Sequence, residues 1–160
     1  MSKVRIINKT IIRIVLFCFI IIWFLGTISP CFNFGFTNAI YPFQKQLYST
    51  VCHQNINKTF TCNDLPFLVC ARCTGIYAGA LFFAIALIAY SKNTIVRTKY
   101  LILLSATMLL DVILVNIGIY EYNKSLSPFT GFLFGSTVFV YILSAVENLL
   151  YSNQKNKNEF

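Results

Sequence analysis

Apolar residues in this chain occur in four long blocks rather than in alternating or helical stripes. The blocks cover residues 11–28, 69–90, 100–120 and 129–151. Each is close to the roughly 20 residues that an α-helix needs to cross the hydrocarbon core of a bilayer. Backbone polar groups in lipid must find partners within their own segment, so we expect helices rather than open strands. The pattern predicts an all-α, polytopic membrane protein built as a four-helix transmembrane bundle.

The four blocks form a single transmembrane domain over residues 1–151, followed by a polar cytoplasmic tail at 152–160. Between the first and second blocks lies a long segment, residues 30–68, which we expect to face outward. Its aromatic, weakly charged part at 32–48 is interrupted by Pro42, and we expect this part to lie on the outer membrane interface.

The first block has a basic start and a short apolar stretch, as a signal peptide does. The residues that follow it, Ser29-Pro30-Cys31, make a poor cleavage site. We therefore expect the first helix to be retained.

The composition excludes several classes of protein. The chain is 57% hydrophobic and 11% charged, whereas soluble proteins carry about 25% charged residues. A soluble enzyme of ordinary composition, a disordered chain and a disulfide-stapled mini-protein are all incompatible with these values. The lipid bilayer is the partner that the sequence predicts, and no signal fixes an oligomeric state, although a homo-oligomer is compatible with it.

The net charge of +8 indicates topology rather than nucleic-acid binding. Lys and Arg lie mainly between and outside the apolar blocks, not clustered on one face. Of the 13 basic residues, nine lie in the N-terminal segment, residues 91–99 and the C-terminal tail, and four lie on the other side. This asymmetry places both termini in the cytoplasm of a multi-pass cell-membrane protein.

Four of the six cysteines and the single histidine fall within a short outward stretch, whereas Cys18 and Cys31 are scattered. The clustered residues are Cys52, His53, Cys62, Cys70 and Cys73. Two thiols at a C-x-x-C spacing, as in Cys70-Ala71-Arg72-Cys73, can bind one metal ion or form and break a disulfide. The cluster predicts a Zn²⁺ site whose ligands are Cys52, His53, Cys70 and Cys73, with Cys62 or Asp64 as the alternative fourth ligand.

Two other interpretations remain open. Structural disulfides are favoured by the oxidising character of an outward loop. A membrane thiol–disulfide oxidoreductase would instead use the Cys70/Cys73 pair, with a thiolate stabilised by the helix N-terminus and Arg72. Electrons would then pass from Cys52/Cys62 to that pair and on to a quinone against the second helix.

Asp111 is an ionisable residue inside the third block, about 13 Å from its outer end. A carboxylate at that depth is costly and is by default a functional-site hypothesis. Asp111 and Arg72 are therefore the candidate catalytic residues, with Asp111 or Asp64 as the base for a metal-activated water. The alternative is that Asp111 accepts hydrogen bonds from neighbouring helices. Glu147, near the inner end of the fourth block, is expected to snorkel to water.

Two G-x-x-x-G pairs indicate close helix packing. Gly75 and Gly79 lie in the second block, and Gly131 and Gly135 lie in the fourth. Such pairs allow helix backbones to approach closely. We expect these two helices to meet in the outer half of the bundle and Asp111 to face inward.

Three stretches of the sequence together resemble a known family. They are Val51-Cys52-His53-Gln54, Thr59-Phe60 and Cys70-Ala-Arg-Cys-Thr-Gly-Ile-Tyr77-Ala-Gly79. They resemble an uncharacterised family of small prokaryotic membrane proteins, the domain of unknown function numbered 2085. The resemblance extends over residues 48–135 and includes Asp111, Gly118, Thr130, Gly131 and Gly135. It implies that Cys52, His53, Cys70, Arg72, Cys73 and Asp111 form one unit, and it implies no reaction.

The chain departs from that family in two places. Ser125-Leu-Ser-Pro128-Phe stands where the family often has Ser-Asn and an Arg. Cys62-Asn63-Asp64 stands about where the family has a Gly-His-Gln-like stretch before the C-x-x-C. If that family histidine is a ligand, Cys62 or Asp64 would have to replace it, so the fourth ligand stays open.

Overall fold

The computed structural model describes residues 2–32, 35–62, 65–89 and 98–157. Its elements are α1 (Ser2–Thr27), the 3₁₀-helix η1 (Ser29–Cys31), α2 (Gly35–Ser49), the 3₁₀-helix η2 (Ile56–Lys58), β1 (Thr61–Cys62), β2 (Leu65–Pro66), α3 (Ala71–Ala89), α4 (Thr98–Ile117) and α5 (Leu126–Lys157). Within these residues, α1, α3, α4 and α5 are long and apolar enough to cross a membrane. The predicted all-α membrane bundle is thereby confirmed.

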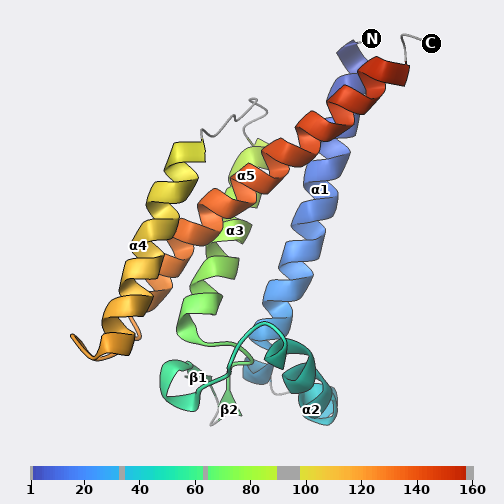
Figure 1. Ribbon diagram of the computed structural model, residues 1–160. Coiled ribbons are helices and arrows are strands. Elements are labelled where there is room, and N and C mark those ends of the chain that lie inside the picture. Colours follow the sequence, from blue (N-terminus) through green and yellow to red (C-terminus); the bar gives the residue numbers. More distant parts are fainter. Residues whose placement is uncertain (1, 33–34, 63–64, 90–97, 158–160) are drawn as a thin grey trace.

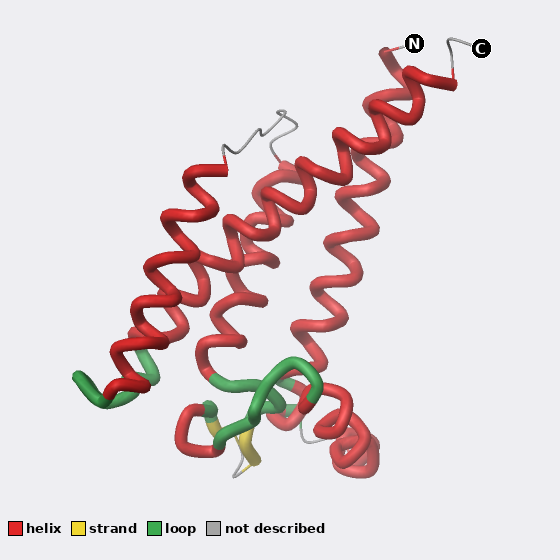
Figure 2. Tube along the Cα trace, in the orientation of Figure 1, coloured by secondary structure: helices red, strands yellow, loops and turns green. Residues whose placement is uncertain are grey.

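The helices are arranged so that α1 begins and α5 ends at the same end of the bundle (Figure 1). We call the opposite end, formed by α2, η2 and the β1–β2 hairpin, the loop end. Figure 2 shows the two short strands there, beside the turns that lead into α3. The strands are antiparallel and pair Thr61 with Pro66 and Cys62 with Leu65.

The crossing of α3 and α5 is the most extensive helix contact among the described residues. A Cβ atom added to Gly75 would overlap the carbonyl oxygen of Pro128, and one added to Gly135 would overlap that of Ile76. Gly79 and Gly131 face carbonyl oxygens of the partner helix in the same way. The predicted close approach of these two helices is confirmed, because each glycine makes room for a backbone atom of the other helix.

Helix α4 ends earlier than the apolar block predicted. Gly118 adopts a φ of +79°, and its N–H bonds to the carbonyl of Val115 while that of Ile119 bonds to Leu114. This is the Schellman arrangement, in which glycine in the left-handed region ends a helix. Residues beyond Ile117 are thereby free to fold back over the loop end.

Helix α2 is an element that the sequence pattern did not predict. Pro42 lies inside it, and proline in a helix interior removes one backbone hydrogen bond. Pro42 is on the exposed side, as are Phe43 and Leu47, whereas Tyr48 is 3% exposed and packs into the core. The helix therefore has one docked face and one apolar face that no described residue covers.

A buried ion pair joins three helices near the other end of the bundle. Arg13 on α1 donates from Nε to Oε1 of Glu147 on α5 at 2.9 Å, and from Nη1 to the carbonyl of Leu87 on α3 at 2.8 Å. The two charged side chains are 7% and 10% exposed. The expectation that Glu147 snorkels freely to water is therefore wrong, because Arg13 holds it inside the bundle.

Candidate metal centre

Three cysteines meet at the loop end. The Sγ atoms of Cys52, Cys70 and Cys73 all lie within 4.8 Å of one another. Cys52 follows α2, Cys70 directly precedes α3, and Cys73 lies in the first turn of α3. We call this group the three-cysteine site. It contains three of the four ligands that the sequence analysis put forward.

Cys52 is held in place by the docking of α2 on α1. Its N–H donates to the carbonyl of Tyr48 at 3.0 Å, which continues the last turn of α2. The Tyr48 hydroxyl donates to the carbonyl of Trp23 at 2.8 Å, and the two ring centroids are 4.9 Å apart. Gly26 faces the same hydroxyl, where a side chain would collide. Burial raises the pKa of Tyr48 to about 12.

Cys70 and Cys73 are positioned by the segment that enters α3. Leu68 and Val69 are 1% and 0% exposed and pack in one core cluster with Tyr48 and Cys52. The N–H of Leu68 donates to the carbonyl of Thr27 at the end of α1. Two consecutive buried residues and a backbone link to α1 thus fix the start of α3.

A backbone N–H group donates to one of the three sulfur atoms. It is the N–H of Cys70, which donates to Cys52 Sγ at 3.2 Å. Such donors, together with the positive end of a helix, stabilise thiolate rather than thiol.

The three thiols share their protons unequally. Hydrogen bonds from Cys70 and then Cys73 lower the pKa of Cys52, and the hydrogen bond to Cys52 is the main cause that raises the pKa of Cys70. One negative charge is therefore favoured on the group, centred on Cys52. A soft, partly ionised set of three sulfur atoms is a ligand set for Zn²⁺ or another thiophilic ion.

Of the proposed fourth ligands, His53 and Cys62 do not join the three-cysteine site. His53 is exposed and is not part of the three-sulfur group. Cys62 forms a disulfide with Cys31, so its assignment as a metal ligand and its pairing with Cys52 in an electron relay are both wrong. Asp64 lies outside the described residues.

Cys31 is the residue that sequence analysis missed. Cys31 stands apart from the clustered cysteines in the sequence, yet its Cα lies 5.2 Å from that of Cys62. The position of Cys31 in the sequence could have indicated this, because Cys31 directly follows the first apolar block and so lies on the same side of the membrane as the cysteine-rich loop. The bridge ties η1 to the β1–β2 hairpin.

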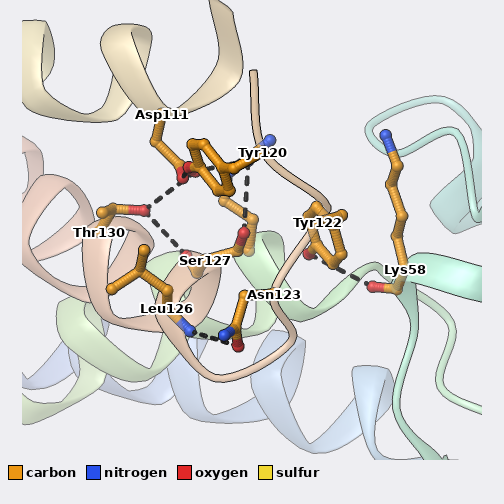
Figure 3. A network of polar contacts seen from close by, with 9 residues as sticks. Lys58, Asp111, Tyr120, Tyr122, Asn123, Leu126, Ser127 and Thr130 are labelled. Carbon is orange, nitrogen blue, oxygen red and sulfur yellow. Dashed lines mark hydrogen bonds and ion pairs between the residues drawn. The ribbon is translucent and has the colours of Figure 1, made fainter. Parts of the chain in front are cut away.

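The two candidate catalytic residues contact each other. Arg72 Nη2 donates to Asp111 Oδ2 at 2.6 Å, and the side chains are 15% and 5% exposed. Asp111 also accepts from the hydroxyls of Tyr120 and Thr130 (Figure 3). Asp111 faces inward, and because α4 ends at Ile117 it lies about 9 Å from the helix end. Their catalytic roles remain predictions.

The Arg72 side chain contacts α4 and α5, whereas the oxidoreductase interpretation expects it to stabilise a thiolate. Besides Asp111, its guanidinium contacts the Ser127 hydroxyl at 3.4 Å and lies 5.6 Å from the centre of the Tyr122 ring. Its Nε is buried without a hydrogen-bond partner. The arginine of the C-x-x-C turn therefore links α3 to α4 and α5.

The chain was compared with known proteins. The family model described as "Predicted membrane protein (DUF2085)" matches residues 52–141. The chain belongs to this family. An uncharacterised protein of Methanocaldococcus jannaschii is 32% identical over 153 residues, which cover 89% of this chain and 96% of that protein. An uncharacterised protein of Methanothermobacter thermautotrophicus is 34% identical over 82 residues, covering 51% of this chain and 74% of that protein. No solved structure matches the chain.

The segment that matches the DUF2085 model includes the candidate site. It begins at Cys52 and extends into α5, so it includes the three-cysteine site and the Arg72–Asp111 pair. Cys31 lies before it, and the disulfide therefore joins the matched segment to α1 and η1.

An apolar groove adjoins the three-cysteine site within the membrane-spanning part of the bundle. It has a volume of about 320 Å³ and is lined by Phe19, Ile20, Trp23, Tyr77 and Ala80. Trp23 and Tyr77 also pack against the core cluster that contains Cys52. Two aromatic side chains are thus shared by the groove and this core cluster.

Proposed function

We propose that this DUF2085 protein binds one zinc-like metal ion through Cys52, Cys70 and Cys73. The observation that carries the proposal is the convergence of three sulfur atoms within 4.8 Å. The backbone N–H of Cys70 donates to Cys52 Sγ at 3.2 Å and supports the proposal, because such donors stabilise bound thiolates.

Three protein ligands leave one coordination position open. In zinc proteins that arrangement is typical of catalytic sites, where water or substrate takes the fourth position and bound water becomes a nucleophile near neutral pH. His53 follows Cys52 directly and is exposed, so it can approach the ion by a local change of the loop. The proposal therefore includes a metal centre with either water or His53 as the fourth ligand.

The proposal places the loop end on the outer face of the cell membrane, with both termini in the cytoplasm. The Cys31–Cys62 disulfide supports this side, because disulfides persist in oxidising surroundings. The distribution of basic residues, nine to four of 13, supports it independently. On an oxidising side, three neighbouring thiols remain reduced most readily when a metal ion binds them.

Native mass spectrometry of detergent-solubilised protein, purified without chelator or reductant, tests the proposal. We expect a mass raised by one metal ion per chain and lowered by the two hydrogens of the Cys31–Cys62 bridge. Cys70→Ser should remove the ion, whereas Cys18→Ser, a matched change at an exposed free cysteine, should retain it. A metal-free chain carrying a second disulfide would contradict the proposal.

A second candidate function is thiol oxidation by a membrane quinone. The observation that favours it is the apolar groove lined by Trp23 and Tyr77. The thiols of Cys70 and Cys73 would join as a disulfide, and their two electrons and two protons would convert the quinone to the quinol. Reduced protein incubated with a soluble quinone should then lose two thiols for each quinol formed. Thiol loss without quinol would exclude this reaction.

A further inference from the structure

Gln54 has an unusual backbone conformation next to the three-cysteine site. Its φ is +49°, and among the described residues it is the non-glycine residue with a positive φ. Left-handed backbone is disfavoured for residues with a Cβ atom and is retained where the surrounding structure requires it. The requirement here can be read from what Gln54 contacts.

Gln54 lies two residues after Cys52, in the turn that leads away from α2. Cys52 Sγ accepts from the N–H of Cys70 at 3.2 Å, which directs the Cys52 side chain toward the start of α3. The positive φ of Gln54 therefore falls in the turn that directly follows the first of the three cysteines.

The side chain of Gln54 connects the two arms of the site. Its Nε2 donates to the carbonyl of Lys45 on α2 and to the carbonyl of Leu68, both at 2.9 Å. Leu68 lies two residues before Cys70 and is itself bonded to Thr27 of α1. Both N–H bonds of a single amide group are thus used, which is the full donor capacity of that nitrogen.

We infer that Gln54 is the positioning residue of the three-cysteine site, holding the Cys52 arm and the Cys70 arm at the separation one metal ion requires. The inference rests on the proposed metal site. Glutamine suits the position because its amide reaches and donates to two carbonyls. A glutamate of the same shape has no N–H to donate when ionised and would repel both carbonyl oxygens.

Cobalt(II) titration of the full-length protein in detergent tests the inference, with Zn²⁺ competition to obtain affinities. The variants are Gln54→Glu, which keeps the shape and removes the donors, and Gln54→Gly, which accepts the positive φ and removes the side chain. Gln46→Glu on the exposed part of α2 is the control for the added charge. Circular dichroism and retention of the Cys31–Cys62 bridge report whether each variant folds.

Both Gln54 variants should bind Co²⁺ about 10- to 100-fold more weakly than the wild type, as is typical when a residue supporting a metal ligand is lost. Their thiolate-to-cobalt absorption bands should shift, a change that general destabilisation does not produce. Gln46→Glu should match the wild type. Should Gln54→Glu fail to fold, Gln54→Gly decides the question, because glycine accommodates the backbone.

Wild-type affinity and unshifted bands in Gln54→Gly would overturn the positioning role and leave the metal site standing. Failure of the wild type to bind either Co²⁺ or Zn²⁺ would overturn the metal site itself. The two failures are therefore distinguishable in one experiment.

Discussion

Arg72 and Asp111 form an ion pair of 2.6 Å that joins the C-x-x-C turn of α3 to the membrane helix α4. Asp111 is the buried residue of α4 among those described, while much of the rest of that helix is exposed and apolar. The ion pair therefore anchors α4 to the end of the bundle that carries the cysteines.

Asp111→Asn should destabilise the protein strongly. The substitution leaves the Arg72 guanidinium buried without a compensating charge, a change that costs about 3–5 kcal/mol when a buried pair is broken. Thermal unfolding in detergent measures the effect. The double variant Arg72→Met/Asp111→Leu, which removes both charges, should recover much of the loss, and an equal loss in the double variant would contradict this account.

Gly75→Leu should separate α3 from α5. A side chain there meets the carbonyl of Pro128, and overpacking of this kind costs about 1–3 kcal/mol or more. The melting temperature in detergent should fall clearly. Ala89→Leu, at an exposed position at the end of the same helix, is the matched control and should melt like the wild type.

Cys31→Ser should free one thiol without affecting the proposed metal site. The bridge closes a separation of 31 residues, so its loss should cost about 3–4 kcal/mol in the chain-entropy treatment. After denaturation in chelator, the wild type should show its four free thiols and the variant five, the fifth being Cys62. Metal content per folded chain should be unchanged, and loss of the metal would show that Cys62 or its loop serves the site.

Tyr48 should make the folded protein sensitive to alkali. Its folded pKa of about 12 lies above the ordinary value of 10, so the stability it contributes is complete below pH 10 and is lost as the pH rises toward 12. Tyr48→Phe removes the hydrogen bond to Trp23, at a cost of about 1 kcal/mol near neutral pH. The free energy of unfolding of this variant should also decrease less between pH 10 and pH 12 than that of the wild type. An equal decrease in both proteins would contradict the role given to Tyr48.

Sequence alone predicted the spans and the central helix crossing well. Length and hydropathy determine the four membrane helices, and the glycine spacing in α3 and α5 identifies their contact surface. The same packing of the glycine-bearing helices predicted that Asp111 faces inward, away from lipid. These features depend on local composition, which the chain displays directly.

Long-range pairing could not be predicted in the same way. The partner of Cys62 is Cys31, and cysteine connectivity depends on how the loop folds back on η1 rather than on spacing. The sequence pattern did not predict α2, because Pro42 interrupts it. The missing N–H of Pro42 is tolerated because the residue lies on the exposed side of the helix. Arg13 contributes to the charge asymmetry that predicts the topology. Its ion pair with Glu147 could not be predicted, because the two residues are 134 positions apart.

X-ray absorption at the zinc K-edge tests the central claim most directly, using protein purified without added metal and then loaded with one equivalent of Zn²⁺. The account predicts three sulfur neighbours at about 2.3 Å and one nitrogen or oxygen neighbour at about 2.0–2.1 Å. Cys52→Ser should reduce the sulfur count by one. A first shell without sulfur, or protein that takes up no zinc while its thiols are reduced, would contradict the account.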